Sequence, residues 1–176
     1  MRWNAISRRP SKVPRIPRPA RAFRPGLAVA AVIIALDQLS KWWIVHRVMD
    51  PPRVIEVTPF FNLVMTWNPG VSFGLFREAG AAAAWLLPTI AAVVVAALLV
   101  WLYRIERLFL GMALAFIIGG AVGNVIDRIL YGAVADFLDF HVMGFHWPAF
   151  NLADTMITIG AVMVVADALL APGHKR

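Results

Sequence analysis

The sequence contains no cysteine, and charged residues are scarce. Without cysteine the protein cannot form disulfides, bind a metal through thiolates or use a thiol nucleophile. Only 15% of the 176 residues are charged while 60% are hydrophobic, and the mean hydropathy is +0.71, far from the composition of a soluble domain. The composition therefore predicts a membrane protein whose chemistry relies on oxygen and nitrogen groups.

Acidic residues are absent from the first 25 residues, which are rich in arginine and proline. Such a segment cannot bury a core, and we predict a disordered basic tail over 1–25. The tail contributes strongly to the formal net charge of +7. A nucleic-acid arm would share this pattern, but aromatic residues are sparse and no reading module follows. We therefore expect no nucleic-acid partner, and a role for the tail in membrane topology.

Four apolar segments approach or exceed the roughly 20 residues that cross a bilayer. They are 26–46, 81–103, 108–127 and 152–171. The first also resembles a signal peptide, but it is too long and lacks a small-x-small cleavage site, so we predict a retained anchor. The basic tail, the turn after the second segment and the C-terminal tail 172–176 carry twelve of the seventeen Lys and Arg residues. The positive-inside rule then predicts that both termini are cytoplasmic.

The two longer connections, 47–80 and 128–151, are expected on the outer side. The first contains RVIEVTPFFNLVMTWNPGVSFGLF, in which β-branched and aromatic residues surround an Asn-Pro-Gly turn, and this pattern predicts short strands. Strand edges are not tolerated in hydrocarbon, so the sheet must lie at the interface or against the helices. The predicted fold is an α-helical integral membrane protein, with four transmembrane helices over 26–171 and a small extracytoplasmic β-sheet.

The third apolar segment ends in a polar face. Gly119 and Gly123 have the small-xxx-small spacing that lets helices approach closely. Asn124, Asp127 and Arg128 follow on one side of the helix. We expect these three residues to organise the outer end of the helix, with Arg128 paired to Asp127.

Two carboxylates are the best candidates for chemistry. Asn151 is placed to cap the fourth helix with Asp154 in its first turn, whereas Asp136 has no such structural explanation. The connection 128–151 leaves and re-enters the same surface, so Asp136 and Asp154 can meet there. Two carboxylates in a poorly solvated pocket share one proton, and the pair can be base and acid at once, as in aspartic proteases.

Other interpretations stay open at this point. A Ser72–Lys41 dyad is compatible with the sequence but has no characteristic spacing. Asp37 and Lys41, at i and i+4, are either a functional pair or an ion pair that satisfies itself. A small transporter or proton-relay protein would also use membrane acids. A metal site would need closer ligand spacing than the sequence offers. The potential ligands are Asp127, Asp136, Asp139, His141, His146 and Asp154.

Four motifs resemble those of the lipoprotein signal peptidases, also called signal peptidase II, in the family's order and with its spacing. They are DQLSKW at 37–42, WNPGVSFG at 67–74, GGAVGNVIDR with VADFLDF through 119–140, and FNLADT at 150–155. The resemblance covers about residues 27–171. It implies a bacterial inner-membrane aspartic endopeptidase with four transmembrane helices and a β-cradle, which removes the signal peptide of diacylglyceryl-modified prolipoproteins just before the lipidated cysteine.

The resemblance implies that Asp136 and Asp154 are the catalytic pair. It also implies pocket and substrate-positioning roles for Asn68, Gly70, Asn124, Arg128, Asn151 and Ala153, and it matches Asp37 and Lys41 to the first-helix motif. The sequence departs from the family at Trp67, where an Arg or His commonly precedes the asparagine. From the resemblance as a whole we expect a monomer that needs no cofactor or metal. Its expected partners are prolipoproteins and membrane lipid, and its active site is expected to face outward.

Overall fold

The computed structural model describes residues 19–70 and 80–170. Our expectations for the tail up to residue 18, for 171–176 and for the VSFG part of the WNPGVSFG motif lie outside this range. The elements are α1 (Phe23–Trp43), the π-helical η1 (Ile44–Val48), β1 (Ile55–Thr58), β2 (Phe61–Asn68), α2 (Gly80–Arg104), α3 (Leu108–Tyr131), β3 (Val134–Val142), β4 (Phe145–His146) and α4 (Leu152–Leu170).

Four helical segments of the described chain are long and apolar enough to cross a membrane, by length and composition. They are α1 with its continuation η1, α2, α3 and α4, and they confirm the four expected spans. α1 begins earlier than expected, at Phe23, because Pro25 falls in its first turn, where no intrahelical N–H is needed. α3 continues to Tyr131, after which Gly132, in the left-handed conformation, donates its N–H to the carbonyl of Arg128 and ends the helix.

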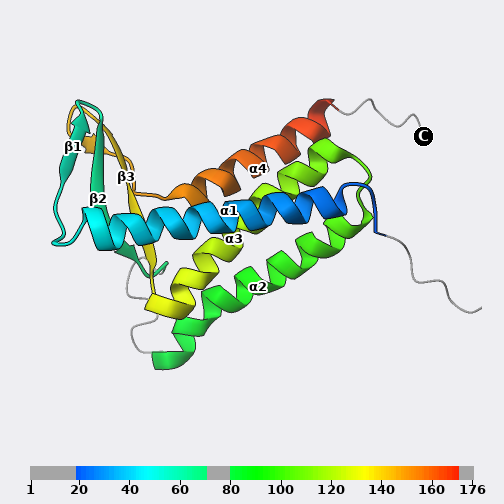
Figure 1. Cartoon of the computed structure of the whole chain (residues 1–176), viewed down its shortest axis with the longest axis horizontal. Helices are drawn as coiled ribbons and strands as arrows, with labels where there is room; N and C mark the ends of the chain where they lie inside the picture. Colours follow the sequence, from blue (N-terminus) through cyan, green and yellow to red (C-terminus); the bar gives the residue numbers. More distant parts are fainter. Residues whose placement is uncertain (1–18, 71–79, 171–176) are drawn as a thin grey trace, which may run out of the picture.

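The central helix is α3, and α1, α2 and α4 pack around it (Figure 1). Small residues permit this close approach: a Cβ added at Gly119 of α3 would lie 2.8 Å from the Cβ of Ile33 on α1. A Cβ added at Gly160 of α4 would lie 2.7 Å from the carbonyl oxygen of Ala113 on α3. The buried core between α1, α2 and α3 consists of Ala22, Ala30, Leu102, Leu114, Ala115 and Ile118.

A four-stranded antiparallel sheet, in the order β1-β2-β3-β4, lies at the end of the bundle opposite the termini (Figure 1). β1 and β2 confirm the strands expected in the first connection. The second connection, expected as a loop, contributes the interior strand β3, which pairs with β2 from Phe140 opposite Phe61 to Val134 opposite Asn68. Most of β3 is buried, so its sequence lacks the alternation that identifies a half-buried strand.

Candidate active site

Asp136 and Asp154 come from different elements and lie at the same end of the bundle. Asp136 is on β3 opposite Thr66 of β2 and is 1% exposed, whereas Asp154 is in the first turn of α4 and is half-buried. Asn151 contacts both residues. Its side-chain N–H donates to Asp136 Oδ1 at 2.7 Å, and its Oδ1 accepts the backbone N–H of Asp154 at 2.9 Å. The structure thus brings together the two carboxylates that the sequence singles out.

Amide groups hold both carboxylates. Asn68 Nδ2 donates to Asp136 Oδ2 at 2.9 Å, so each oxygen of Asp136 accepts a bond from an asparagine side chain. Asn124 Nδ2 donates to Asp154 Oδ1 at 2.7 Å, and the backbone N–H of Asn151 donates to Asp154 Oδ2 at 3.3 Å. These donors fix the orientation of both carboxyl groups and stabilise negative charge on them.

Each of the three asparagines offers its N–H to a carboxylate because another donor already engages its oxygen. Asn68 Oδ1 accepts the N–H of Gly70 at 2.8 Å in the turn after β2. Asn151 Oδ1 accepts the backbone N–H three residues on, which confirms the predicted cap of α4. Asn124 Oδ1 accepts a hydrogen bond from the ammonium group of Lys41 at 3.0 Å. An amide has one acceptor end and one donor end, so these contacts determine which end faces the carboxylate.

Lys41 is the centre of a buried ionic cluster. Its Nζ lies 2.8 Å from Asp37 Oδ2 and 2.9 Å from Asp127 Oδ2, and all three residues are at most 4% exposed. The expected pair of Asp37 and Lys41 is present, but a second carboxylate from α3 joins it. Two carboxylates and one ammonium leave a formal charge of −1. Through Asn124, this cluster is connected to Asp154.

The expected pairing of Arg128 with Asp127 is wrong. Asp127 lies on the face of α3 that packs against α1, and besides its ion pair it accepts the N–H of Ala135 at 3.2 Å. Arg128 lies about 100° further around the helix, and its Nη1 donates to the carbonyl of Asn124 at 3.3 Å. A Cβ at Gly70 would lie 2.9 Å from Arg128 Nη2 at a φ of +79°, which explains the glycine in this turn.

Gln38 is a site residue that the sequence reasoning missed. Its Nε2 lies 2.9 Å from Asp127 Oδ1 and 3.2 Å from the carbonyl of Gly123, so it ties α1 to α3. The available signal was an amide directly after Asp37 within a predominantly apolar helix. Ala153 completes the connection between helices, because it is fully buried and its N–H donates to Asp37 Oδ1 at 3.0 Å.

Asp139 has its partners within the sheet. Its carboxylate lies 2.8 Å from His146 Nδ1 and accepts the Nδ2–H of Asn62 at 3.0 Å. Within the described residues, no three His, Asp or Glu side chains are placed to hold a metal ion. Ser72, the serine of the alternative dyad, lies outside the described residues, and two carboxylates engage its proposed partner Lys41.

The two aspartates of β3 differ in their acidity. Burial raises the pKa of Asp136 to about 6, with a further contribution from the negative charge of Asp154 and against the hydrogen bonds of Asn68 and Asn151. Burial also acts on Asp139, but hydrogen bonds from His146 and Asn62 outweigh it, and the pKa of Asp139 is lowered. Asp136 is therefore the carboxyl group on β3 that retains a proton closest to neutral pH.

Two clefts reach this polar region. Asp154 opens onto a groove of about 370 Å³ between α4 and the chain that precedes it. The other lining residues of the groove are Trp147, Phe150, Thr155, Thr158 and Ile159. Thr158 and Ile159 are exposed on the lateral face of α4, so the groove connects Asp154 with the lipid-facing surface.

The second cleft, of about 240 Å³, lies between α1, β2 and α3. It is lined by Gln38, Lys41, Trp42, Val45, His46, Trp67, Asp127, Tyr131 and Ala135. Trp67, the departure from the family pattern, is 42% exposed, and its ring centroid lies 5.4 Å from that of Tyr131. At this position the cleft therefore has an aromatic wall in place of a basic side chain.

The fold and the site define a class of protein. Four apolar helices carry at one end a pair of aspartates, one buried and one half-buried, that are both held by amides, and such carboxylate pairs are what aspartic peptidases use to hydrolyse peptide bonds. The model of the signal peptidase (SPase) II family matches residues 29–170. The chain belongs to this peptidase family, and the resemblance drawn from the four motifs is confirmed.

Named relatives and solved structures agree with this assignment. The lipoprotein signal peptidase of Burkholderia thailandensis is 44% identical over 150 residues, which are 84% of this chain and 89% of the relative. That of Paraburkholderia phymatum is 47% identical over the same shares. Two structures described as a bacterial membrane enzyme, solved in meso, are similar. One has a TM-score of 0.74 at 27% identity, covering 92% of this chain and 97% of the other; the second has 0.75 at 28%, covering 90% and 100%.

Proposed function

We propose that the protein is an aspartic endopeptidase that removes the signal peptide from diacylglyceryl-modified prolipoproteins, cleaving before the lipidated cysteine. The observation that carries this function is the arrangement of Asp136 and Asp154, two carboxylates from separate elements that Asn151 links directly. The membership in the signal peptidase II family and the names of the relatives support the same substrate class.

In the proposed mechanism Asp154 is ionised and Asp136 is protonated. Asp154 lies in the first turn of α4, where the positive end of the helix dipole interacts favourably with a carboxylate. It is also the more accessible of the two, so it can contact water in the adjoining groove. Asp136 is buried, and its pKa of about 6 favours retention of the shared proton.

The pair moves one proton in each direction and needs no cofactor. Asp154 takes a proton from water as the water oxygen bonds to the scissile carbonyl carbon, and Asp136 donates its proton to the carbonyl oxygen. When the C–N bond breaks, Asp154 gives its proton to the leaving nitrogen and a hydroxyl proton returns to Asp136. The original one-proton state is then restored.

The proposed orientation places the sheet and the aspartates on the outer side of a bacterial inner membrane and both termini in the cytoplasm. The surplus of Lys and Arg at the termini and in the turn between α2 and α3 supports it. A substrate whose signal helix and acyl chains lie in the bilayer would approach from the side, and the groove beside Asp154 opens in that direction. We propose that the enzyme acts as a monomer.

A transporter or proton-relay function is less well supported. A conducting protein would carry its acids along a path near the middle of the bilayer. Here Asp136 and Asp139 lie on β3, outside the spanning helices, and Asp154 lies in the first turn of α4. Asp37 and Asp127 lie in spanning helices but are bound to the same ammonium group.

The test is cleavage of a purified diacylglyceryl-modified prolipoprotein by the purified protein, with and without a chelator. We expect Asp136→Asn and Asp154→Asn each to fold, to insert in membranes and to lose cleavage, while Asp139→Asn on the same strand retains it. Substantial cleavage by Asp136→Asn or Asp154→Asn contradicts the catalytic pair. Loss of the wild-type activity on chelation contradicts the metal-free mechanism.

A further inference from the structure

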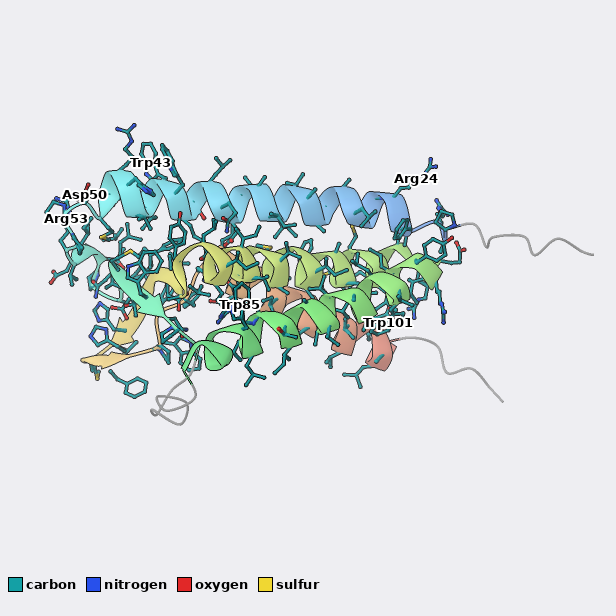
Figure 2. All side chains as sticks on the ribbon, turned by 90° about the horizontal axis from the view of Figure 1, so that it is seen from below. Arg24, Trp43, Asp50, Arg53, Trp85 and Trp101 are labelled. Carbon is teal, nitrogen blue, oxygen red and sulfur yellow. The ribbon has the colours of Figure 1, made fainter. Side chains whose placement is uncertain are left out.

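At the end of the bundle that carries the termini, α1 and α2 lie close together, and they diverge toward the sheet (Figures 1 and 2). The backbone N–H of Ala20 donates to the carbonyl of Tyr103 at 3.0 Å. The rings of Phe23 and Tyr103 meet edge to face, with centroids 5.1 Å apart. The two helices therefore form a wedge that is closed at this end by direct contacts.

A crevice of about 540 Å³ lies between the two helices at this end of the wedge. It is lined by Phe23, Leu27, Leu99, Val100, Tyr103 and Arg104. Leu27 and Val100 are exposed, so the crevice opens on the lateral surface that faces lipid. Its lining is apolar except for a phenol and the guanidinium of Arg104, the last residue of α2. One end of the crevice is thus hydrophobic and the other is cationic.

Positive charge exceeds negative charge around this crevice. The charged residues described at this end are Arg21, Arg24, Arg104, Glu106, Arg107 and Asp167. Arg107 lies 2.6 Å from Asp167, and Glu106 accepts the backbone N–H of Arg21 at 3.0 Å. Arg24 and Arg104 have no carboxylate partner in the part of the chain that the structure describes. Of these two, Arg104 lines the crevice.

We propose that this crevice binds one anionic phospholipid of the leaflet in contact with the termini, with an acyl chain between α1 and α2 and the phosphate at Arg104. Basic pockets between membrane helices bind anionic headgroups on the cytoplasmic side. Figure 2 shows Arg24 and Trp101 at the same end of the bundle, and tryptophan marks the level of the headgroups. The site lies at the opposite end of the helices from the aspartates and is independent of the catalytic proposal.

The experiment is native mass spectrometry of the full chain with added phosphatidylglycerol or phosphatidylcholine of identical acyl chains. Arg104→Gln removes the headgroup charge, and Val100→Trp fills the chain-binding crevice without changing charge. Arg53→Gln, an exposed arginine next to the sheet, is the matched control. The basic tail is the same in every protein, so its contribution cancels. Glycerol 3-phosphate serves as a competitor that has the phosphate but no acyl chain.

We expect Arg104→Gln to weaken phosphatidylglycerol binding about fivefold, the effect of one basic residue near an anionic surface, and to leave phosphatidylcholine unaffected. Val100→Trp should weaken phosphatidylglycerol binding as well, and Arg53→Gln should behave as wild type. The proposal is overturned if Arg104→Gln and Arg53→Gln have equal effects, or if phosphatidylcholine binds as tightly as phosphatidylglycerol. It is also overturned if glycerol 3-phosphate displaces the lipid, because the site would then be one for free phosphate.

Discussion

Substitution of Asp136 by asparagine should change how protein stability depends on pH. The ordinary carboxyl pKa of 3.8 becomes about 6 in the folded protein, mainly because of burial. A raised pKa means that the folded state favours the protonated form. Asp136 therefore contributes stability that is fully present below the unfolded pKa and is lost as the pH rises through the folded pKa. Asparagine cannot ionise and does not have this loss.

The size of the effect follows from the shift. A difference of about two pKa units corresponds to about 3 kcal/mol, since each unit is worth about 1.4 kcal/mol. The free energy of unfolding of Asp136→Asn, minus that of the wild type, should therefore rise by about 3 kcal/mol between about pH 4 and about pH 6.5 and then level off. An asparagine side chain has only one oxygen, so one of the two amide donors, Asn68 or Asn151, loses its acceptor in Asp136→Asn. This loss shifts the difference in free energy of unfolding by a constant at every pH and leaves its rise unchanged.

The assay is reversible unfolding of both proteins in mixed detergent micelles at a series of pH values. Asp139→Asn is the matched control, because Asp139 lies three residues away on β3 and its pKa is lowered. Asp139 contributes stability that is present above the unfolded pKa and is lost as the pH falls through the folded pKa. The free energy of unfolding of Asp139→Asn, minus that of the wild type, should therefore fall with rising pH, and this change should occur at lower pH than the change for Asp136→Asn. A flat or falling Asp136→Asn difference between about pH 4 and about pH 6.5 would refute the reasoning.

Three further outcomes are expected. Asn68→Ala removes a hydrogen bond that stabilises the ionised form of Asp136, so the pKa of Asp136 should rise and the high-pH limb of the kcat/KM profile in the cleavage assay should move to higher pH. A limb that stays in place or moves to lower pH contradicts this. Lys41→Met leaves two buried carboxylates without their ion pair and should lower the free energy of unfolding in detergent by about 3–5 kcal/mol. A decrease below about 1 kcal/mol would contradict this expectation. Gly160→Ala should cost about 1–3 kcal/mol by thermal unfolding, because its Cβ meets a backbone oxygen, while Ala161→Leu on the exposed face should not; equal effects would argue against tight helix packing.

The helices could be predicted from the sequence because length and hydropathy alone determine what crosses a bilayer. Their ends depended on single residues: α3 runs on until Gly132, which adopts a left-handed cap. The strand β3 could not be predicted in the same way. Its pairing with β2 is a long-range contact, and Asp136 and Asp139 interrupt the apolar pattern that a buried strand normally shows.

The aspartate pair could be anticipated because the chain returns to the same surface, but the contacts around it could not. Whether Asp127 binds Arg128 or Lys41 depends on which face of α3 packs against α1, and spacing along one helix does not reveal this. The orientation of Asn124 depends on an ammonium group from another helix. Gln38 was passed over for the same reason, since its partners belong to α3 as well as to its own helix.

The contacts that orient the three asparagine side chains around the aspartates have a consequence for biosynthesis. Asn68 is oriented by a turn after β2, Asn124 by a lysine of α1, and Asn151 by the start of α4. No single hairpin or helix pair contains all three arrangements. A chain that has inserted only its first three helices already carries Asp136 but lacks Asp154 and the amide that links them. The proposed catalytic pair thus forms only with the last insertion step, and until then a partly assembled chain does not hold both carboxylates.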